Sequence, residues 1–185
     1  QYVSAWGHVN SLTNSNKLPV IFSINCHSGN FINDQTTGYT ECIAENFIRK
    51  TNGGGVAVVA PTYTSYSGYN DAALIGMMDA IWSNPGLIPN FGSGGTVNPS
   101  LNSHGDIRTM GDVVNQGLLR MTQTWASTSK YKMQYEIYQY FGDPAMKIWT
   151  QTPTVVSHNA PDTLERLSNT IQLTTNISSG IATLM

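Results

Sequence analysis

Two short apolar runs, separated by one segment with helical periodicity, constrain the fold of this chain more than any other feature. VIFSIN, residues 20–25, and VAVVA, residues 56–60, have the length and the β-branched content of buried strands. Between them, ECIAENFIRK at 41–50 carries one apolar stripe at spacings of three and four. That stripe consists of Ile43, Ala44, Phe47 and Ile48. A strand, a helix and a second strand in this order predict a parallel pair and therefore an α/β fold.

Two further helices and another strand are expected along the chain. Asp71 is positioned to cap one helix, and Asp112 to open the next. Their expected core-facing residues are Leu74, Ile75, Met78, Ile81 and Trp82 in the first, and Val114, Gly117, Leu118, Met121 and Trp125 in the second. Residues 84–105 are rich in Pro, Gly, Asn and Ser, which is typical of an irregular excursion. YEIYQYFGDPAMKIWT, residues 135–150, predicts a strand, a turn at Gly-Asp-Pro and the end of an apolar strand.

The character of the sequence changes near residue 151. Residues 1–150 alternate between strand and helix patterns, whereas residues 151–185 hold only short β-prone runs between turn residues. A tail of about 35 residues is shorter than the roughly 40 that a stable independent domain needs. We therefore expect residues 151–185 to be the first strands of a truncated β-sandwich.

Composition excludes several classes of function. Charged residues make up 11% of the chain and the net charge is −2, so neither a nucleic-acid surface nor an anionic membrane partner is expected. No apolar run reaches the roughly 18 residues that span a bilayer. Polarity that comes mainly from Ser, Thr, Asn and Gln fits a secreted or surface bacterial protein. The chain starts at Gln1 without a signal peptide, so we expect an internal segment of a longer precursor.

Cys26 is the residue most suggestive of chemistry. It follows the first expected strand, on a turn that contains Gly29, and so lies at the carboxyl edge of the sheet, where open α/β folds place their sites. A thiol at this edge can act as a nucleophile if a histidine takes its proton and loop amides hold an oxyanion. The alternative is a buried thiol that packs as a small apolar side chain. Position alone leaves both open.

Several features in fixed order resemble the gingipain family of bacterial cysteine endopeptidases. They are the lead-in LTNSNKLP, a strand that ends in Cys, the pattern C-x-x-G-[DN]-F from Cys26 to Phe31, and C-x-A-E from Cys42 to Glu45. VAVVAPT, IRTMGDVVNQG and YFGDPAMKIWTQTP resemble later family segments, and the tail that ends in GIATL resembles the start of the immunoglobulin-like domain that follows. The resemblance covers nearly the whole chain.

This resemblance implies a fold and an activity. The fold is the caspase-like three-layer α/β sandwich with a mostly parallel sheet, residues 1–150 being the later part of the catalytic domain and residues 151–185 the start of the immunoglobulin-like domain. Cys26 is then the catalytic thiol of an endopeptidase that acts on protein or peptide substrates. Trp6-Gly7 resembles the stretch that follows the family's catalytic His-Gly pair, so that histidine is expected upstream of Gln1, in the N-terminal remainder of the catalytic domain. The segment alone is therefore expected to be inactive.

Four histidines within the chain are weaker candidates for the base. His8 resembles a non-catalytic loop position. His27 adjoins Cys26, so its side chain is expected to point away from the thiol. His104 precedes a glycine but follows the cysteine in chain order, although the order of triad members does differ between folds. His158 lies in the β-prone tail and is expected to be exposed.

Cys42 and Glu45 lie at the start of the first expected helix. Cys42 is expected to pack against the sheet, and a Cys26–Cys42 disulfide is not expected because it would consume the nucleophile. Glu45 is interpreted as a surface carboxylate or as an i,i+4 partner of Arg49, with little support for a role as base.

The loop after the second strand is expected to form a wall of the substrate pocket. By resemblance, its contact residues are Tyr66, Ser67, Asn70 and Asp71. Gingipains cleave after Arg or Lys, but Ser67 stands where the family tends to carry Trp. Asn70 stands near where the lysine-specific branch carries Asp, which puts a basic preference in doubt. Asp71 can restore an acidic group to the pocket, or it can serve only as a helix cap.

Two further expectations remain. Structural calcium is possible by resemblance, with oxygen ligands in the loop 28–41 at Asn30, Asp34 and Glu41 but without EF-hand spacing; catalysis needs no cofactor. The alternative function is a non-catalytic surface adhesion or binding module on the same scaffold, which the altered pocket loop favours.

Overall fold

The computed structural model describes residues 7–32, 41–83, 105–152, 154–161 and 172–178. The chain divides into two compact units, Gln1–Ile148 and Trp149–Met185. Among the described helices, none combines the length and apolar character needed to cross a bilayer. The candidate site lies entirely in the first unit.

A three-stranded sheet forms the centre of the first unit. Its order is β1 (Val20–Phe22), β2 (Ala57–Pro61), β3 (Tyr138–Phe141). β1 pairs parallel to β2, with Val20 opposite Ala57, as the strand–helix–strand pattern predicts. β3 pairs antiparallel to β2, with Tyr140 opposite Val59. The described sheet is therefore mixed, not mostly parallel.

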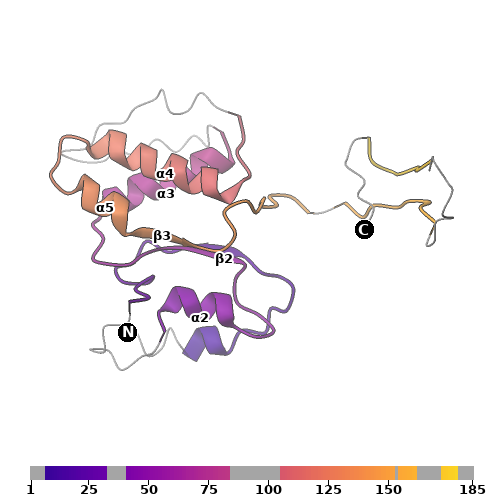
Figure 1. Cartoon of the computed structure of the whole chain (residues 1–185), viewed down its shortest axis with the longest axis horizontal. Helices are drawn as coiled ribbons and strands as arrows, with labels where there is room; N and C mark the ends of the chain where they lie inside the picture. The colour runs from indigo at the N-terminus through magenta and orange to yellow at the C-terminus, as the bar shows by residue number, and fades with distance from the viewer. Residues whose placement is uncertain (1–6, 33–40, 84–104, 153, 162–171, 179–185) are drawn as a thin grey trace, which may run out of the picture. The chain divides into compact units, whose positions relative to one another are not determined.

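Helices cover both faces of this sheet (Figure 1). The helices are α2 (Ile43–Arg49), α3 (Tyr69–Ile81), α4 (Met110–Trp125) and α5 (Tyr131–Ile137). Successive residues of β2 point to opposite faces. Val59 packs in a cluster with α3 and α4, whereas Val58 and Ala60 pack with Cys42 and Ala44 at the start of α2. All five residues of β2 are buried, which explains its uninterrupted apolar sequence.

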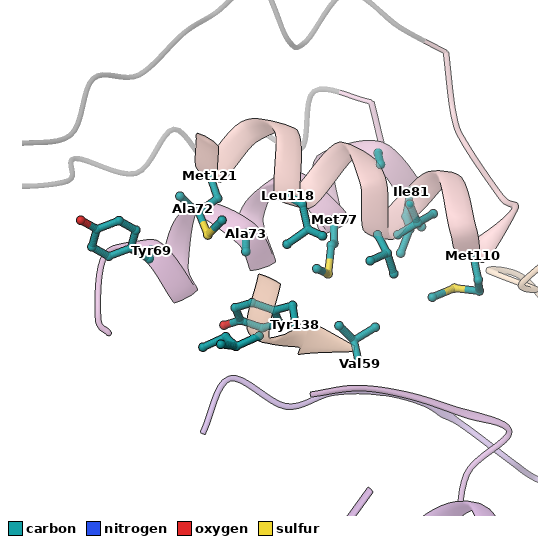
Figure 2. Close-up of a cluster of buried hydrophobic side chains, with 14 residues drawn as sticks. Val59, Tyr69, Ala72, Ala73, Met77, Ile81, Met110, Leu118, Met121 and Tyr138 are labelled. Carbon is teal, nitrogen blue, oxygen red and sulfur yellow. The ribbon is translucent and has the colours of Figure 1, made fainter. Parts of the chain in front are cut away.

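The α3–α4 pair supplies most of the larger cluster (Figure 2). Met77 and Ile81 of α3 and Met110, Val113 and Met121 of α4 are almost fully buried. The helices approach closely because Gly76 and Gly117 face each other's helix: an added Cβ on Gly76 would lie 2.9 Å from the Gly117 Cα. The stripe predicted for α4 is confirmed for Val114, Gly117, Leu118 and Met121.

Both of the longer helices begin earlier than predicted. α3 starts at Tyr69 with Gly68 as its N-cap, and the Asp71 carboxylate accepts a hydrogen bond from the Gly68 N–H at 3.2 Å. Asp71 is thus a first-turn residue and not the cap. Likewise Thr109 caps α4, and Asp112 lies in the first turn. Acidic residues favour the first turn as well as the cap because both lie at the positive end of the helix dipole, so pattern alone does not separate them.

The segment around residue 135 is partly helical, contrary to the prediction of a strand. Tyr135 and Ile137 belong to α5, and β3 begins only at Tyr138. The predicted turn is present, with the Asp143 carboxylate accepting a hydrogen bond from the Ala145 N–H at 2.8 Å. Beyond it the expected strand end is reduced to one bridge between Lys147 and Thr109.

In the second unit, the described residues include one isolated bridge, between His158 and Thr175. The identification of residues 151–185 as the start of an immunoglobulin-like domain stays a prediction.

Candidate active site

The chain leaves the sheet before Cys26. β1 ends at Phe22, three residues earlier than predicted, although the Ser23 N–H still donates to the Val59 carbonyl at 2.8 Å. The Ile24 carbonyl then accepts from Asn70 Nδ2 at 2.9 Å and from Ser65 Oγ at 3.3 Å. Because side chains replace the backbone partner at Ile24, strand pairing stops and the chain turns.

The turn that carries Cys26 is held by its neighbours. His27 has a left-handed backbone conformation, with φ of 59°, and its N–H donates to the Tyr63 carbonyl at 3.1 Å. Ser28 Oγ donates to the Asn25 carbonyl at 2.8 Å. Gly29 lies so close to the sheet that a Cβ would stand 2.9 Å from the Ala60 carbonyl oxygen. These contacts restrict the backbone of the turn and so hold Cys26 in place.

The Cys26 sulfur lies against Ser65, in the loop that follows β2. Sγ is 3.2 Å from the Ser65 carbonyl oxygen, 3.4 Å from the Ser65 amide nitrogen and 3.7 Å from Ser65 Oγ. The Cys26 side chain is partly exposed and belongs to neither buried apolar cluster. Cys26 is therefore not a core thiol, and its surroundings can bond to sulfur in both the thiol and the thiolate form.

Cys42 has the opposite character. It is 7% exposed and packs with Ala44, Val58 and Ala60, as predicted. Both cysteines are free thiols. Burial raises the pKa of the Cys42 thiol to about 11, and the nearby Glu45 carboxylate contributes to the rise. Glu45 itself accepts a hydrogen bond from the Cys42 N–H at 2.8 Å, while Arg49 pairs with Glu41 and not with Glu45.

The raised pKa of Cys42 predicts a loss of stability in alkali. The thiol ionises near pH 9.0 in the unfolded chain and only near pH 11 in the folded one. The free energy by which the protonated thiol favours the folded state is therefore complete below about pH 9 and is lost as the pH approaches 11. Urea unfolding across this interval should show the parent chain losing up to about 3 kcal/mol more than Cys42→Ala, since each unit corresponds to about 1.4 kcal/mol. Parallel pH profiles for the two proteins would contradict this.

None of the described histidines is hydrogen-bonded to the Cys26 sulfur. The His27 Nε2 lies 3.2 Å from Thr64 Oγ1, and its ring packs edge-on against Tyr63 at 5.2 Å between centroids. His27 thus points to other partners, as its adjacency to Cys26 predicts. His8 and His158 are exposed, and His104 lies outside the described residues.

The four predicted pocket residues separate into two groups. Ser67 and Asp71 are exposed, and the partly buried Tyr66 has the Lys130 ammonium 4.0 Å above its ring. Asn70 is 8% exposed and bonds inward: Nδ2 donates to Ile24 and to Ser65 Oγ, and Oδ1 accepts from Tyr138 Oη. Substrate contact by these residues stays a prediction.

Sequence reasoning did not single out Ser65, Gln134 or Tyr138. Gln134 Oε1 accepts from the Tyr66 N–H at 3.0 Å and its Nε2 donates to the Thr64 carbonyl at 3.2 Å, which fixes the chain on both sides of Ser65. One feature of the sequence could have pointed to Ser65. Ser65 follows β2, the parallel neighbour of β1, so its loop and the Cys26 turn were bound to meet at one sheet edge.

Within the described ranges, no three His, Cys, Asp or Glu side chains are grouped to hold a metal ion. Of the calcium ligands suggested by sequence, Asp34 lies outside those ranges, and Glu41 is paired with Arg49.

Comparisons with known proteins identify the family of this chain. The model of peptidase family C25 matches residues 3–149. Gingipain R2 of Porphyromonas gingivalis strain ATCC BAA-308 / W83 is 26% identical over 188 aligned positions, covering 98% of this chain and 23% of the relative. Gingipain R1 of Porphyromonas gingivalis is 24% identical over 98% of this chain and 17% of its own length. The chain therefore spans less than a quarter of these relatives.

Solved structures give the same relationship. The crystal structure of the Arg-specific cysteine proteinase gingipain R (RgpB) matches with a TM-score of 0.64 and 25% identity, covering 86% of this chain and 32% of that one. A complex of the Porphyromonas gingivalis RgpB pro- and mature domains matches with a TM-score of 0.62 and 25% identity, over 86% and 33% of the two chains. The chain belongs to peptidase family C25, the gingipain family of cysteine peptidases.

Proposed function

We propose that residues 1–150 are the later part of a caspase-like catalytic domain and that Cys26 is the nucleophile of a secreted or surface-located cysteine endopeptidase. The observation that carries this proposal is the contrast between the two thiols. Cys26 is partly exposed against the polar groups of Ser65, where two parallel strands end, whereas Cys42 is buried among apolar side chains with a raised pKa. A nucleophilic cysteine needs access and hydrogen-bond donors, and Cys26 has both.

The proposed reaction proceeds through an acyl-enzyme. The Cys26 sulfur attacks the scissile carbonyl carbon, and a histidine from outside residues 1–185 takes the thiol proton and passes it to the departing amine. Water then hydrolyses the thioester. Among the described residues, none accepts a hydrogen bond from the Cys26 N–H, so this amide is available to the oxyanion, together with an amide beside the histidine.

The residues proposed to contact the substrate are Tyr66, Ser67 and Asp71. Asn70 is proposed to support the pocket loop from within, because its amide bonds inward to Ile24, Ser65 and Tyr138. The similar structure is that of an Arg-specific proteinase, gingipain R, and the exposed Asp71 carboxylate is a group that can attract a basic side chain. The Lys130 ammonium, which lies over the Tyr66 ring, would instead repel a basic side chain of the substrate.

Covalent labelling tests the assignment of the nucleophile. A peptidyl chloromethyl ketone should label a longer protein, which includes the histidine-bearing segment, once per molecule at Cys26. Mass spectrometry of the labelled peptide identifies the site, and excess competing peptide substrate should slow the reaction. Cys42→Ala is the matched control and should label normally, because its thiol is buried.

The absence of labelling at Cys26 distinguishes between the two proposed functions. A folded longer protein with the histidine present that remains unlabelled at Cys26 would contradict the peptidase proposal. That outcome favours the alternative, a non-catalytic adhesion or binding module on the same scaffold.

A further inference from the structure

A chain of buried hydrogen bonds connects Cys26 to the β3 strand. Its members are Ser65, Asn70 and Tyr138, whose exposed fractions are 7%, 8% and 5%. They come from the loop after β2, from the first turn of α3 and from the first position of β3. Buried polar groups are costly unless their partners are well placed, so a fully connected set of this kind holds one geometry.

Tyr138 determines the orientation of the Asn70 amide. Burial raises the pKa of Tyr138, and the charges of Asp71 and Cys26 raise it further, so the phenol keeps its proton. Tyr138 Oη lies 2.5 Å from Asn70 Oδ1, and a protonated phenol donates to that carbonyl oxygen. The amide nitrogen must then face the other way.

Asn70 in turn orients Ser65. The two N–H bonds of Nδ2 go to the Ile24 carbonyl at 2.9 Å and to Ser65 Oγ at 3.1 Å. Ser65 Oγ therefore acts as an acceptor toward Asn70, and its single proton remains for a different partner. The two within reach are the Ile24 carbonyl at 3.3 Å and the Cys26 sulfur at 3.7 Å. The Ile24 carbonyl keeps the Asn70 donor in either case, so the hydroxyl proton can turn from Ile24 to the sulfur when the sulfur is a thiolate, because the negative charge makes it the stronger acceptor.

Ser65 can thus serve both forms of the sulfur. The thiol S–H donates to the Ser65 carbonyl at 3.2 Å, whereas a thiolate accepts from the Ser65 N–H at 3.4 Å and from its hydroxyl. We propose that Asn70 is a positioning residue that, with Tyr138, directs the Ser65 hydroxyl at the Cys26 sulfur and so stabilises its thiolate. This inference rests on the proposed function in one respect: the thiolate that the network stabilises is the nucleophile of the proposed peptidase.

The pH dependence of alkylation tests the proposal without any need for turnover. The 185-residue chain carrying Cys42→Ala is treated with iodoacetamide between pH 5 and 10, and the rate at Cys26 is followed by mass spectrometry. Ser65→Ala should move the midpoint of the profile upward by about half to one pH unit, which lowers the rate at pH 7 about threefold, since a more basic thiolate is also more nucleophilic. Asn70→Ala should shift it in the same direction, and Ser65→Thr, which keeps the hydroxyl, should restore it.

The Ser65 and Asn70 variants leave unaltered the other ionisable groups of the surrounding elements. They are His27 in the same turn, Asp71 on α3 and Tyr138 on β3. Thr64→Val is the matched control, because it removes the neighbouring hydroxyl, which contacts His27 and not the sulfur. Its midpoint should equal that of the parent.

Two results separate this inference from the proposed function. If Ser65→Ala and Asn70→Ala are folded by circular dichroism and keep the parent midpoint, the positioning role is overturned. If Asn70→Ala does not fold, Tyr138→Phe takes its place, because it removes only the hydroxyl that orients the Asn70 amide. An unchanged midpoint in both Tyr138→Phe and Ser65→Ala would again overturn the positioning role. Shifted midpoints together with no chloromethyl ketone labelling support the network while contradicting the peptidase.

Discussion

Replacement of Cys26 by alanine should reduce peptide hydrolysis by the longer protein to background. Without the sulfur no thioester forms, and the remaining groups supply only binding and oxyanion stabilisation, so we expect kcat to fall by about 10⁴-fold or more. The fold should be unaffected, because Cys26 is partly exposed and belongs to neither apolar cluster. Turnover of a peptide library measures the first effect, and thermal unfolding measures the second.

Cys42→Ala is the control for this experiment. It removes the buried thiol, so it should lower stability while leaving kcat near that of the parent. Turnover that persists in Cys26→Ala would contradict the assignment of the nucleophile. Turnover by the 185-residue chain alone, lost on Cys26→Ala, would show instead that the base is one of His8, His27, His104 and His158.

Replacement of Gly117 by alanine should strongly destabilise the chain, even though alanine is the better helix former by about 1 kcal/mol. A Cβ on Gly117 would lie 2.4 Å from Met77 Cγ and 2.6 Å from the Ala73 carbonyl oxygen. Met77 has a flexible side chain, but the Ala73 carbonyl belongs to the α3 backbone, so the two helices must move apart. Overpacking of this kind typically costs about 1–3 kcal/mol, and we expect the upper end of that range.

Asn115→Ala provides the matched comparison on the same helix. Asn115 is exposed on α4, so this change should be neutral or slightly stabilising. Urea unfolding of the three proteins, followed by circular dichroism at 222 nm, gives the differences. A Gly117→Ala protein as stable as Asn115→Ala would mean that α3 and α4 are not closely packed.

Local patterns were sufficient for much of the first unit. The apolar run at 56–60 predicted the central strand, and the helical stripe before it predicted the parallel crossover from β1. The core face of α4 and the burial of Cys42 also followed from sequence. These features depend on the spacing of apolar residues within about ten positions, and burial of an apolar face is favourable whatever lies opposite.

Local patterns failed where polar groups choose distant partners. Ile24 has the sequence of a strand residue, yet its carbonyl bonds to Asn70, 46 residues away, and β1 ends early. Tyr135 and Ile137 lie in a run of β-prone residues but are helical. Ser65, which contacts the sulfur, had no distinguishing local pattern.

The amino-acid sequence by itself determined that a strand, a helix and a buried strand lead to a cysteine at a sheet edge, because burial of apolar side chains has a period that can be read along the chain. Only the tertiary structure decided which groups surround that cysteine, the antiparallel direction of β3 and the inward orientation of Asn70. Hydrogen bonds are directional, and here they join Cys26 to a residue 39 positions away and Asn70 to one 68 positions away, so these partners meet only after the chain has folded.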